Sequence, residues 1–429
     1  MTFEGAQEYL LGLIDETRSR REQSLDRMRA LLRALGDPQN AYPTVHVGGT
    51  SGKGSTATMI AAVLTAAGHR TGLHVKPHLQ SVTERASIDA TAIPPERFVA
   101  LLEEMMPAIE QTTAAHGAPS YYETLLALAF TYFAREAVDV AVIEVGLGGR
   151  LDGTNVIIPE VAVITSVGFD HTEVLGETLE AIAAEKAGIV KEGVPLVVGA
   201  DRPEAIAVIE SAAREKHAPL IHVDDASQIA VQVGDERRFE VTTAHAGYDI
   251  RLPVFGSFQR RNARTAILAL EALPQRLRPA PEAVERGLGR VAIPGRMEVF
   301  AGTPTIVLDI AHNAEKAEHL AAALRERFPG RRLRALVAIG ESKDASAILD
   351  ALAPLLDSLF VTSFSAAGRR ALEPERLLGL AQSLRIPARA IADPVEAFRD
   401  ACAQSAADDV LVVTGSTFVV AAVRQEAIG

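Results

Sequence analysis

A glycine-rich segment with a single lysine is the part of this chain best suited to bind phosphate. It reads His46-Val-Gly-Gly-Thr-Ser-Gly-Lys-Gly-Ser-Thr56. The segment follows an apolar, β-type run at 44–47 and precedes the small and aliphatic residues of 57–67, which favour a helix. Successive glycines let backbone N–H groups converge on an anion, and the helix N-terminus and Lys53 add positive charge. We expect the segment to hold a nucleotide triphosphate, with the Ser55 hydroxyl available to a metal ion.

The spacing of this segment departs from the strict phosphate-loop pattern G-x-x-x-x-G-K-[ST]. Val47 occupies the place of the first glycine, and Gly54 follows the lysine, so Ser55 stands one position later than the pattern requires. A glycine-rich turn with an incidental lysine is the alternative. The combination of strand, loop, lysine and helix favours a phosphate site.

Two further strand ends carry side chains that could bind a metal ion. Residues 138–145 form an almost continuous apolar run that contains Glu144 near its end, as expected of a parallel strand buried on both faces. His171 follows the next such run, 160–167. Because the carboxyl ends of parallel strands meet at one edge of a sheet, Ser55 and Glu144 could meet at one Mg²⁺ beside the triphosphate, and an imidazole could join them. The alternatives are a strand-end carboxylate turned to solvent and a histidine that is only a satisfied polar residue.

Two other motifs predict less when they are read alone. The glycines after the second strand fail as a dinucleotide fingerprint, because Leu151 occupies the third glycine position of G-x-G-x-x-G and no helical pattern follows directly. A nicotinamide-dependent enzyme is therefore disfavoured. Glu185 and Lys186 lie on a predicted helix, where such a pair is usually solvated.

The alternation of apolar strands and helices predicts an α/β protein. Residues 44–217 suggest a doubly wound, P-loop-type central domain, and the short alternating runs within 228–252 suggest a small antiparallel subsheet. Beyond Ile293-Pro-Gly-Arg296 the alternation resumes, which predicts a smaller, Rossmann-like C-terminal α/β domain. We therefore expect an N-terminal ATP-binding domain at 1–295 and a C-terminal domain at 296–429.

Composition bounds the kind of protein and its partners. The chain has 429 residues, of which 48% are hydrophobic, enough for large cores. Its net charge is −12 with both signs interspersed, which argues against nucleic acid as a partner and means that anionic substrates need locally placed cations. The single cysteine, Cys402, excludes an internal disulfide and a thiolate metal cluster. The charged start at 1–21 and the lack of a long apolar run predict a cytoplasmic protein without a membrane partner.

Taken in order, these motifs resemble the folylpolyglutamate synthase and dihydrofolate synthase family, within the Mur ligase superfamily of ATP-dependent amide-forming ligases. The resemblance covers almost the whole chain. The matching segments are 24–28, 35–38, 46–56, 77–79, 84–85, 144–155, 164–172, 185–189, Gln259 with Asn262, 294–296, Asp309 with 311–313, and 414–416.

The resemblance implies roles in binding ATP and Mg²⁺. The phosphates would be held by Thr50, Ser51, Gly52, Lys53, Gly54, Ser55 and Thr56. The metal ligands would be Ser55, Glu144, His171 and Lys186, the last as a carbamylated lysine. Asn262 and Arg296 would contact ATP from the two sides of the domain boundary, with Asp309 at the ribose and His312 near the amino-acid substrate. The residues closest to the chemistry would then be Lys53, His171, Lys186 and His312.

The resemblance also implies the substrates and the reaction. A carboxylate of dihydropteroate or of a folate would attack the γ-phosphorus of ATP, and the amine of L-glutamate would displace phosphate from the acyl phosphate. The positions around the acceptor acid would be Lys76, Ser120, Tyr122, Asp152 and Gly153. We expect a monomer that acts on small molecules.

The chain departs from the usual family pattern at several positions. Ser51 replaces asparagine, Gly153 replaces alanine, and Ile310 replaces glycine. Lys76 replaces a serine whose hydroxyl can serve a second metal; a charged ammonium cannot ligate Mg²⁺, so Lys76 could replace that cation or point elsewhere. Apart from Ser51, these changes cluster near the acceptor rather than at ATP. Two alternatives therefore stay open: a Mur-type ligase for another acid or amine, and a nucleotide-binding protein without ligase activity.

Overall fold

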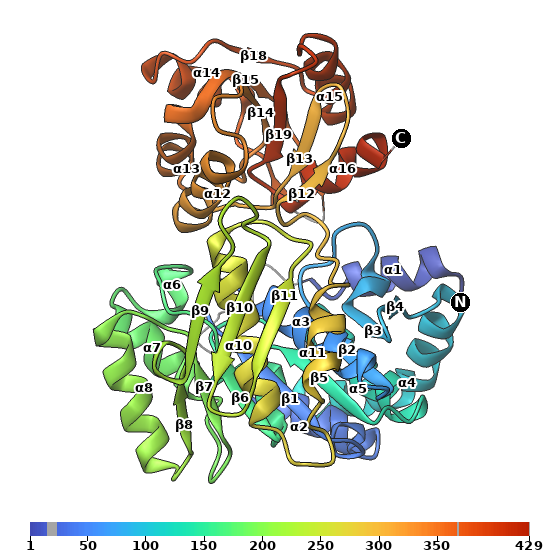
Figure 1. The fold of residues 1–429 in the computed structure, drawn as a ribbon. Coiled ribbons are helices and arrows are strands. Elements are labelled where there is room, and N and C mark those ends of the chain that lie inside the picture. Colours follow the sequence, from blue (N-terminus) through green and yellow to red (C-terminus); the bar gives the residue numbers. More distant parts are fainter. Residues whose placement is uncertain (15–23, 367–368, 429) are drawn as a thin grey trace. The chain divides into compact units, whose positions relative to one another are not determined.

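The structure, a computed structural model, describes residues 1–14, 24–366 and 369–428. The charged start of the chain at 1–21 lies partly outside these residues, and its described part contains α1 (Phe3–Leu11). The chain divides into an N-terminal unit, Met1–Pro253 with Gln259–Val291, and a C-terminal unit, Val254–Phe258 with Ala292–Gly429. Figure 1 shows the sheets and helices of each unit along the chain.

The large sheet of the N-terminal unit has the strand order β4-β3-β2-β5-β1-β6-β7-β8. The strands from β2 to β8 in this order are parallel, whereas β3 and β4 are antiparallel to their neighbours. Every residue of the central strands β1 and β5 is buried, which explains their unbroken apolar sequences. The bounds are β1 (Thr44–Gly48), β2 (Thr71–His74), β3 (Ala86–Ile88), β4 (Thr91–Ala92), β5 (Val140–Glu144), β6 (Val161–Ile164), β7 (Leu196–Val198) and β8 (Leu220–His222).

Helices connect the parallel strands of this sheet, as in a doubly wound fold. Their apolar faces build two cores, one around Phe98, Phe130 and Phe133 and another around Ile164, Ile182 and Ile209. The helices are α2 (Asp26–Ala34), α3 (Lys53–Ala66), α4 (Pro95–His116), α5 (Tyr121–Arg135), α6 (Thr172–Leu175), α7 (Leu179–Ala187), α8 (Pro203–Glu215), α9 (Val223–Ala226), α10 (Ser257–Glu271) and α11 (Pro281–Leu288), with 3₁₀ turns η2 (Pro38–Asn40), η3 (Val82–Arg85) and η4 (Gly153–Val156).

The predicted small antiparallel sheet is present, in the order β11-β10-β9. Its strands are β9 (Ser227–Val231), β10 (Arg238–Thr243) and β11 (Gly247–Arg251). Burial alternates along β10, with Phe239 and Val241 inside, which is the two-residue period that the sequence shows. The sheet is tied to α10, because the hydroxyls of Thr243 and Tyr248 both donate to Glu271 Oε1 at 2.6 Å.

The C-terminal unit has a second sheet, in the order β12-β13-β19-β14-β15-β18, in which β12 is the antiparallel edge. Its core lies around Val307, Leu324 and Val337. The strands are β12 (Glu298–Phe300), β13 (Thr305–Leu308), β14 (Leu333–Val337), β15 (Leu356–Val361), β18 (Ala388–Ala390) and β19 (Val410–Thr414), with a hairpin of β16 (Ser365–Ala366) and β17 (Arg369–Arg370). The helices are α12 (Ala314–Arg327), α13 (Ala345–Leu352), α14 (Pro374–Ser383), α15 (Pro394–Ala403) and α16 (Thr417–Ile428), with the 3₁₀ turn η5 (Ala353–Leu355).

The predicted fold class is confirmed: a doubly wound α/β unit with an antiparallel subsheet and a second, smaller α/β unit. The sequence did not indicate β3, β4 and β8, which are short. Helix α3 begins at Lys53, inside the glycine-rich segment, rather than at Ala57 as predicted. No helix among the described residues is both long and apolar enough to cross a bilayer.

Candidate active site

The phosphate loop, residues 49–55, joins β1 to α3 and is fixed to the segment that follows β6. The backbone N–H of Thr50 donates to the Ser166 carbonyl at 2.9 Å, and the Thr50 hydroxyl donates to the Gly168 carbonyl at 3.1 Å. The N–H of Ser51 donates to the Ser166 hydroxyl at 2.9 Å. The loop is therefore held in shape by its contacts to the segment after β6.

Gly52 and Lys53 give the loop its sharp turn and its charge. Gly52 has φ 82° and caps α3, and a Cβ on it would lie 2.4 Å from Asn262 Oδ1. Only glycine fits there, because both the left-handed backbone and the close amide exclude a side chain. The Lys53 ammonium donates to the carbonyls of Gly49 and Thr50 at 2.9 and 3.0 Å. Lys53 and Asn262 thus both lie at this turn.

Glu144, at the end of β5, faces the phosphate loop. It is only 3% exposed, and a Cβ on Gly54 would lie 3.2 Å from its Oε2 atom. The same oxygen accepts a hydrogen bond of 2.9 Å from the backbone N–H of Lys76. The alternative of a strand-end carboxylate turned to solvent is therefore wrong.

The other two predicted metal ligands lie on the elements after β6. His171, at φ 52°, precedes α6, and its ring nitrogens lie 3.8 Å from Asp170 Oδ1 and 3.6 Å from Glu173 Oε1. Lys186 lies on α7 and is 2% exposed, whereas Glu185 pairs with the exposed Arg150. A lysine so deeply buried is not the solvated partner that the sequence suggested.

The predicted acceptor loop, residues 146–155, is organised around the Asp152 carboxylate and is called the acceptor loop below. Its Oδ1 atom accepts bonds from the Thr154 N–H at 3.0 Å, the Thr154 hydroxyl at 2.6 Å and the Tyr122 hydroxyl at 3.0 Å. Its Oδ2 atom accepts from the Leu147 N–H at 2.8 Å. Burial, and then the Asp152 charge, raise the pKa of Tyr122 well above its usual value, so Tyr122 is a neutral donor. Four donors fix the orientation of one carboxylate.

A buried histidine extends this network, and the sequence analysis missed it. His46 in β1 is 0% exposed, and its Nε2 atom lies 2.8 Å from Thr154 Oγ1. Because the Thr154 hydroxyl donates to Asp152, it accepts from His46, which places the imidazole proton on Nε2. Burial lowers the pKa of His46 to about 3, so the ring is neutral. A polar residue inside an apolar strand was the available signal.

Ser120 and Gly153 have structural tasks near the acceptor loop. Ser120 caps α5 in a capping box: its hydroxyl accepts from the Glu123 N–H and donates to Glu123 Oε2 at 2.8 Å. Gly153 is buried, and a Cβ on it would lie 3.1 Å from Leu126 Cδ2. The glycine therefore allows the acceptor loop to pack closely on α5.

The C-terminal unit brings three predicted residues together. Asp309 follows β13, is 5% exposed, and accepts bonds from the N–H groups of Met297 and Ala311 at 2.9 and 2.8 Å. Burial raises its pKa, and the nearby Arg296 guanidinium opposes that rise. His312 Nδ1 lies 2.8 Å from the Ile310 carbonyl, and its pKa falls well below the usual value because of burial and Lys316. This imidazole is therefore neutral.

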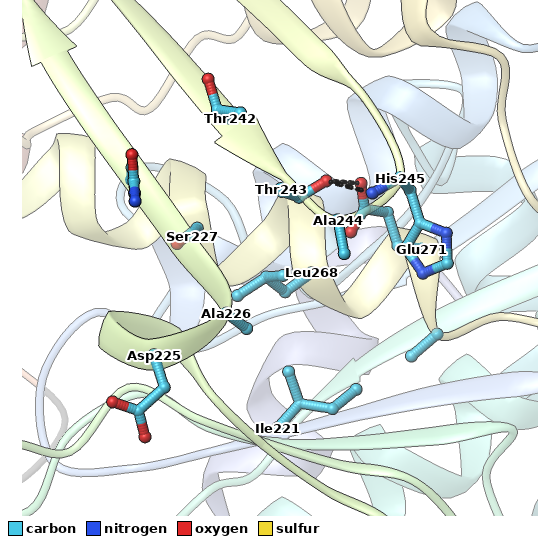
Figure 2. A pocket seen from close by; sticks show the side chains of 12 residues that line it. Ile221, Asp225, Ala226, Ser227, Thr242, Thr243, Ala244, His245, Leu268 and Glu271 are labelled. Carbon is cyan, nitrogen blue, oxygen red and sulfur yellow. Dashed lines mark hydrogen bonds between the residues drawn. The ribbon is translucent and has the colours of Figure 1, made fainter.

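A cavity of 440 Å³ lies elsewhere in the N-terminal unit, between α9, β9, β10 and α10 (Figure 2). Glu271 forms part of the cavity wall, and its carboxylate accepts a hydrogen bond from the Thr243 hydroxyl. The lining residues are Ile221, Asp225, Ala226, Ser227, Gln228, Thr242, Thr243, Ala244, His245, Leu268, Glu271 and Ala272. They include none of the residues predicted to bind phosphate, metal or acceptor.

Comparison with known proteins identifies the family. Residues 47–270 match the Mur ligase middle domain, and residues 295–417 match the Mur ligase, glutamate ligase domain. A relative from Bacillus subtilis named dihydrofolate synthase/folylpolyglutamate synthase is 35% identical, with 94% of each chain covered. The chain belongs to the folylpolyglutamate synthase/dihydrofolate synthase family. The resemblance inferred from the sequence is confirmed, and the protein is an ATP-dependent ligase.

Solved structures of this ligase family share the complete fold. Folylpolyglutamate synthase from Mycobacterium tuberculosis, complexed with ADP, is 35% identical with a TM-score of 0.90, covering 99% of this chain and 98% of that chain. The bifunctional synthase from Yersinia pestis, complexed with AMPPNP and a Mn ion, is 30% identical with a TM-score of 0.87, covering 100% of this chain and 98% of that chain. These two relatives were thus solved with adenine nucleotides, one of them together with a Mn ion.

The residues of this ligase fit Mg²⁺ bound together with a nucleotide. Among the described residues, no group of three or more His, Cys, Asp and Glu could hold a metal alone. Mg²⁺ suits such a site, because it usually takes one or two carboxylates and completes its shell with phosphate oxygens and water. The buried Glu144 carboxylate beside Gly54 supplies an oxygen of this kind. The Ser51 and Thr56 hydroxyls are buried without a hydrogen-bond partner in the described chain.

Proposed function

We propose that this ligase joins L-glutamate to the carboxylate of dihydropteroate, of a folate, or of both, with ATP converted to ADP and phosphate. Every reactant is anionic, and the chain itself carries a net charge of −12, so the reaction needs positive charge at the site. Catalysis then depends on cations and N–H groups placed where charge develops.

The first step is transfer of the γ-phosphoryl group to the acceptor carboxylate. A carboxylate oxygen bonds to the γ-phosphorus as the bond to the ADP oxygen breaks, which gives an acyl phosphate. Thr50, Ser51, Gly52, Lys53, Gly54, Ser55 and Thr56 bind the phosphates, and Lys53 neutralises charge as ADP leaves. Ser55, Glu144, His171 and a carbamylated Lys186 would hold Mg²⁺, which supplies charge neutralisation at the phosphates.

The second step joins the amine of L-glutamate to the acyl phosphate carbon. Nitrogen bonds to carbon, phosphate leaves, and the amine loses protons. We assign His312 to the amino-acid substrate, where its neutral imidazole can accept a hydrogen bond. Asn262, Arg296 and Asp309 are assigned to ATP, with Asp309 at the ribose.

The acceptor acid lies at the loop around Asp152, next to Tyr122 and Gly153 and close to Lys76. The single observation that carries this proposal is the fixed Asp152 carboxylate, which accepts four hydrogen bonds and so keeps a defined orientation. A carboxylate of this kind suits an acceptor that presents N–H donors, as the amino and ring N–H groups of a pterin do. Ser120 supports this site through the α5 cap.

Phosphate release tests the proposal. Purified protein is incubated with ATP, Mg²⁺ and L-glutamate, and with dihydropteroate, dihydrofolate or tetrahydrofolate in turn. We expect release that requires both glutamate and a pterin acid. Release with a different acid and none with the three pterins would instead favour a Mur-type ligase for another substrate.

We further propose that the enzyme is a cytoplasmic monomer. One polypeptide supplies all the residues assigned above. Light scattering on the purified protein checks the oligomeric state against the 45.6 kDa chain mass.

A further inference from the structure

Lys76 is a lysine of the N-terminal unit placed where two reacting anions would meet. It follows β2, whose residue His74 is paired in register with Ile143 of β5, directly before Glu144. Its backbone N–H donates to Glu144 Oε2 at 2.9 Å. The parallel register therefore brings Lys76 to the same sheet edge as Glu144.

The charges around Lys76 come from both the phosphate loop and the acceptor loop. The ammonium of Lys53 and the guanidinium of Arg85 repel it, and the carboxylates of Asp152 and Glu144 attract it. A lysine side chain is ordinarily a cation at neutral pH. Lys76 is thus a cation between the residues assigned to phosphate and those assigned to the acceptor.

The Lys76 ammonium has no hydrogen-bond acceptor or ion-pair partner among residues 1–14, 24–366 and 369–428. An ammonium carries three donors, and leaving them unmatched in a partly buried place is costly. A structure tolerates such a group where a ligand supplies the acceptors. Lys53 and Arg85 add positive charge around this ammonium, which favours an anionic ligand.

We propose that the Lys76 ammonium binds the reacting carboxylate of the acceptor acid and offsets the repulsion between this carboxylate and the terminal phosphate of ATP. A second divalent cation has this task in two-metal phosphoryl-transfer sites. An ammonium cannot ligate a metal and repels one, so it takes the place of such an ion. The inference rests on the proposed function for the identity of the acid.

Three substitutions separate charge from structure. Lys76→Met keeps the length of the side chain without its charge, Lys76→Arg keeps the charge, and Lys76→Ser offers a hydroxyl that could ligate Mg²⁺. Lys216→Met is the matched control, because Lys216 is an exposed lysine at the C-terminus of α8. Thermal melts of all variants report whether each is folded.

Initial rates are measured while acceptor, ATP and Mg²⁺ are varied in turn. For Lys76→Met we expect kcat/KM for the acceptor to fall by roughly 100-fold, with the KM for ATP little changed, whereas Lys76→Arg should retain most of the rate. Lys76→Ser should need more Mg²⁺ than wild type. Unchanged acceptor kinetics in Lys76→Met would overturn the proposal, and so would an equal loss in the Met and Arg variants.

The measurement with varied Mg²⁺ tests a separate part of the proposal, the comparison of Lys76 with a second cation. An unchanged Mg²⁺ requirement in Lys76→Ser would overturn the comparison with a second cation. The wild-type enzyme, run in parallel, distinguishes a failure of the proposed function, because it would then show no turnover with any pterin acid. In that event the four variants are assayed with the carboxylic acid that does support phosphate release, and their rates are compared with one another. The same outcomes apply.

Discussion

His46 Nε2 and Thr154 Oγ1, 108 residues apart in the chain, lie 2.8 Å from each other in a fully buried hydrogen bond. This bond joins β1, the strand that leads into the phosphate loop, to the acceptor loop. The Thr154 hydroxyl in turn donates a hydrogen bond of 2.6 Å to Asp152 Oδ1. The position of the Asp152 carboxylate is thereby coupled to β1, the strand that leads into the phosphate loop.

Removing the Thr154 hydroxyl should weaken acceptor binding and leave ATP binding intact. Thr154→Val keeps the shape of the side chain but deprives both His46 and Asp152 of a partner, which should destabilise the fold by about 1–3 kcal/mol. We expect a higher KM for the acceptor acid and an unchanged KM for ATP. Thr154→Ser is the matched control and should behave like wild type in both measurements. Equal acceptor KM values in the Val and Ser variants would contradict a positioning role for the hydroxyl.

The buried His46 predicts a loss of stability in acid. Its pKa is about 3 in the folded protein and about 6.5 for a solvated histidine, so the unfolded chain takes up a proton that the folded chain does not. This contribution to stability is present above the unfolded pKa and declines as the pH falls from 6.5 toward 3.

A glutamine at position 46 can donate the same bond without titrating. Between about pH 7.5 and about pH 5.5 the wild-type free energy of unfolding should fall by about 1.3 kcal/mol more than that of His46→Gln. Urea unfolding at both pH values measures the difference. Parallel losses in the two proteins would show that His46 does not titrate as its burial requires.

Glu144→Gln should weaken the use of Mg²⁺ without unfolding the protein. The amide oxygen can still accept the Lys76 N–H, so the β2 and β5 ends stay joined, but the negative charge that would face the metal is lost. We expect a higher half-activating Mg²⁺ concentration and a fall of roughly 100-fold in kcat. Full turnover at the wild-type Mg²⁺ concentration would mean that Glu144 is not a metal ligand.

Alanine substitutions at two neighbouring glycines should have opposite effects on stability. Gly54 lies within α3, where alanine is favoured by up to about 1 kcal/mol, so Gly54→Ala should not lower the melting temperature. Its methyl group would press on Glu144 Oε2 at 3.2 Å, and we expect weaker ATP and Mg²⁺ binding.

Gly52→Ala should impair both stability and binding, because Gly52 has φ 82° and its Cβ would lie 2.4 Å from Asn262 Oδ1. Melting curves with and without ATP and Mg²⁺ distinguish the two variants. A melting temperature for Gly52→Ala equal to that of Gly54→Ala would contradict the argument.

The fold was predictable where local signals agreed with the tertiary structure. Residues 95–116 form helix α4, whose ends carry local sequence signals: Pro95 suits its first position and Gly117 follows its end. The strand that ends at Glu144 was predictable from its unbroken apolar run. Strands β3 and β4 have three and two residues, too few to show a period, and they depend on pairing with β2.

The candidate site was predictable in its residues more than in its contacts. Lys53 and Glu144 could be placed at one sheet edge because parallel strands end there. Their relation to Lys76 depends on the path of the loop after β2, which no local pattern encodes. The His46 contact needs a strand and a loop 108 residues apart, and Ser120 proved to be a helix cap whose role is clear only with Glu123 beside it.

The fate of the acceptor's carboxylate oxygens tests the central claim most directly. Dihydropteroate labelled with oxygen-18 in both carboxylate oxygens is incubated with the enzyme, ATP, Mg²⁺ and L-glutamate. Mass spectrometry then measures the oxygen-18 content of the product and of the released phosphate. An acyl phosphate predicts one labelled oxygen in the phosphate and one in the new amide, with one glutamate added. Unlabelled phosphate, or phosphate without a glutamylated product, would contradict the account.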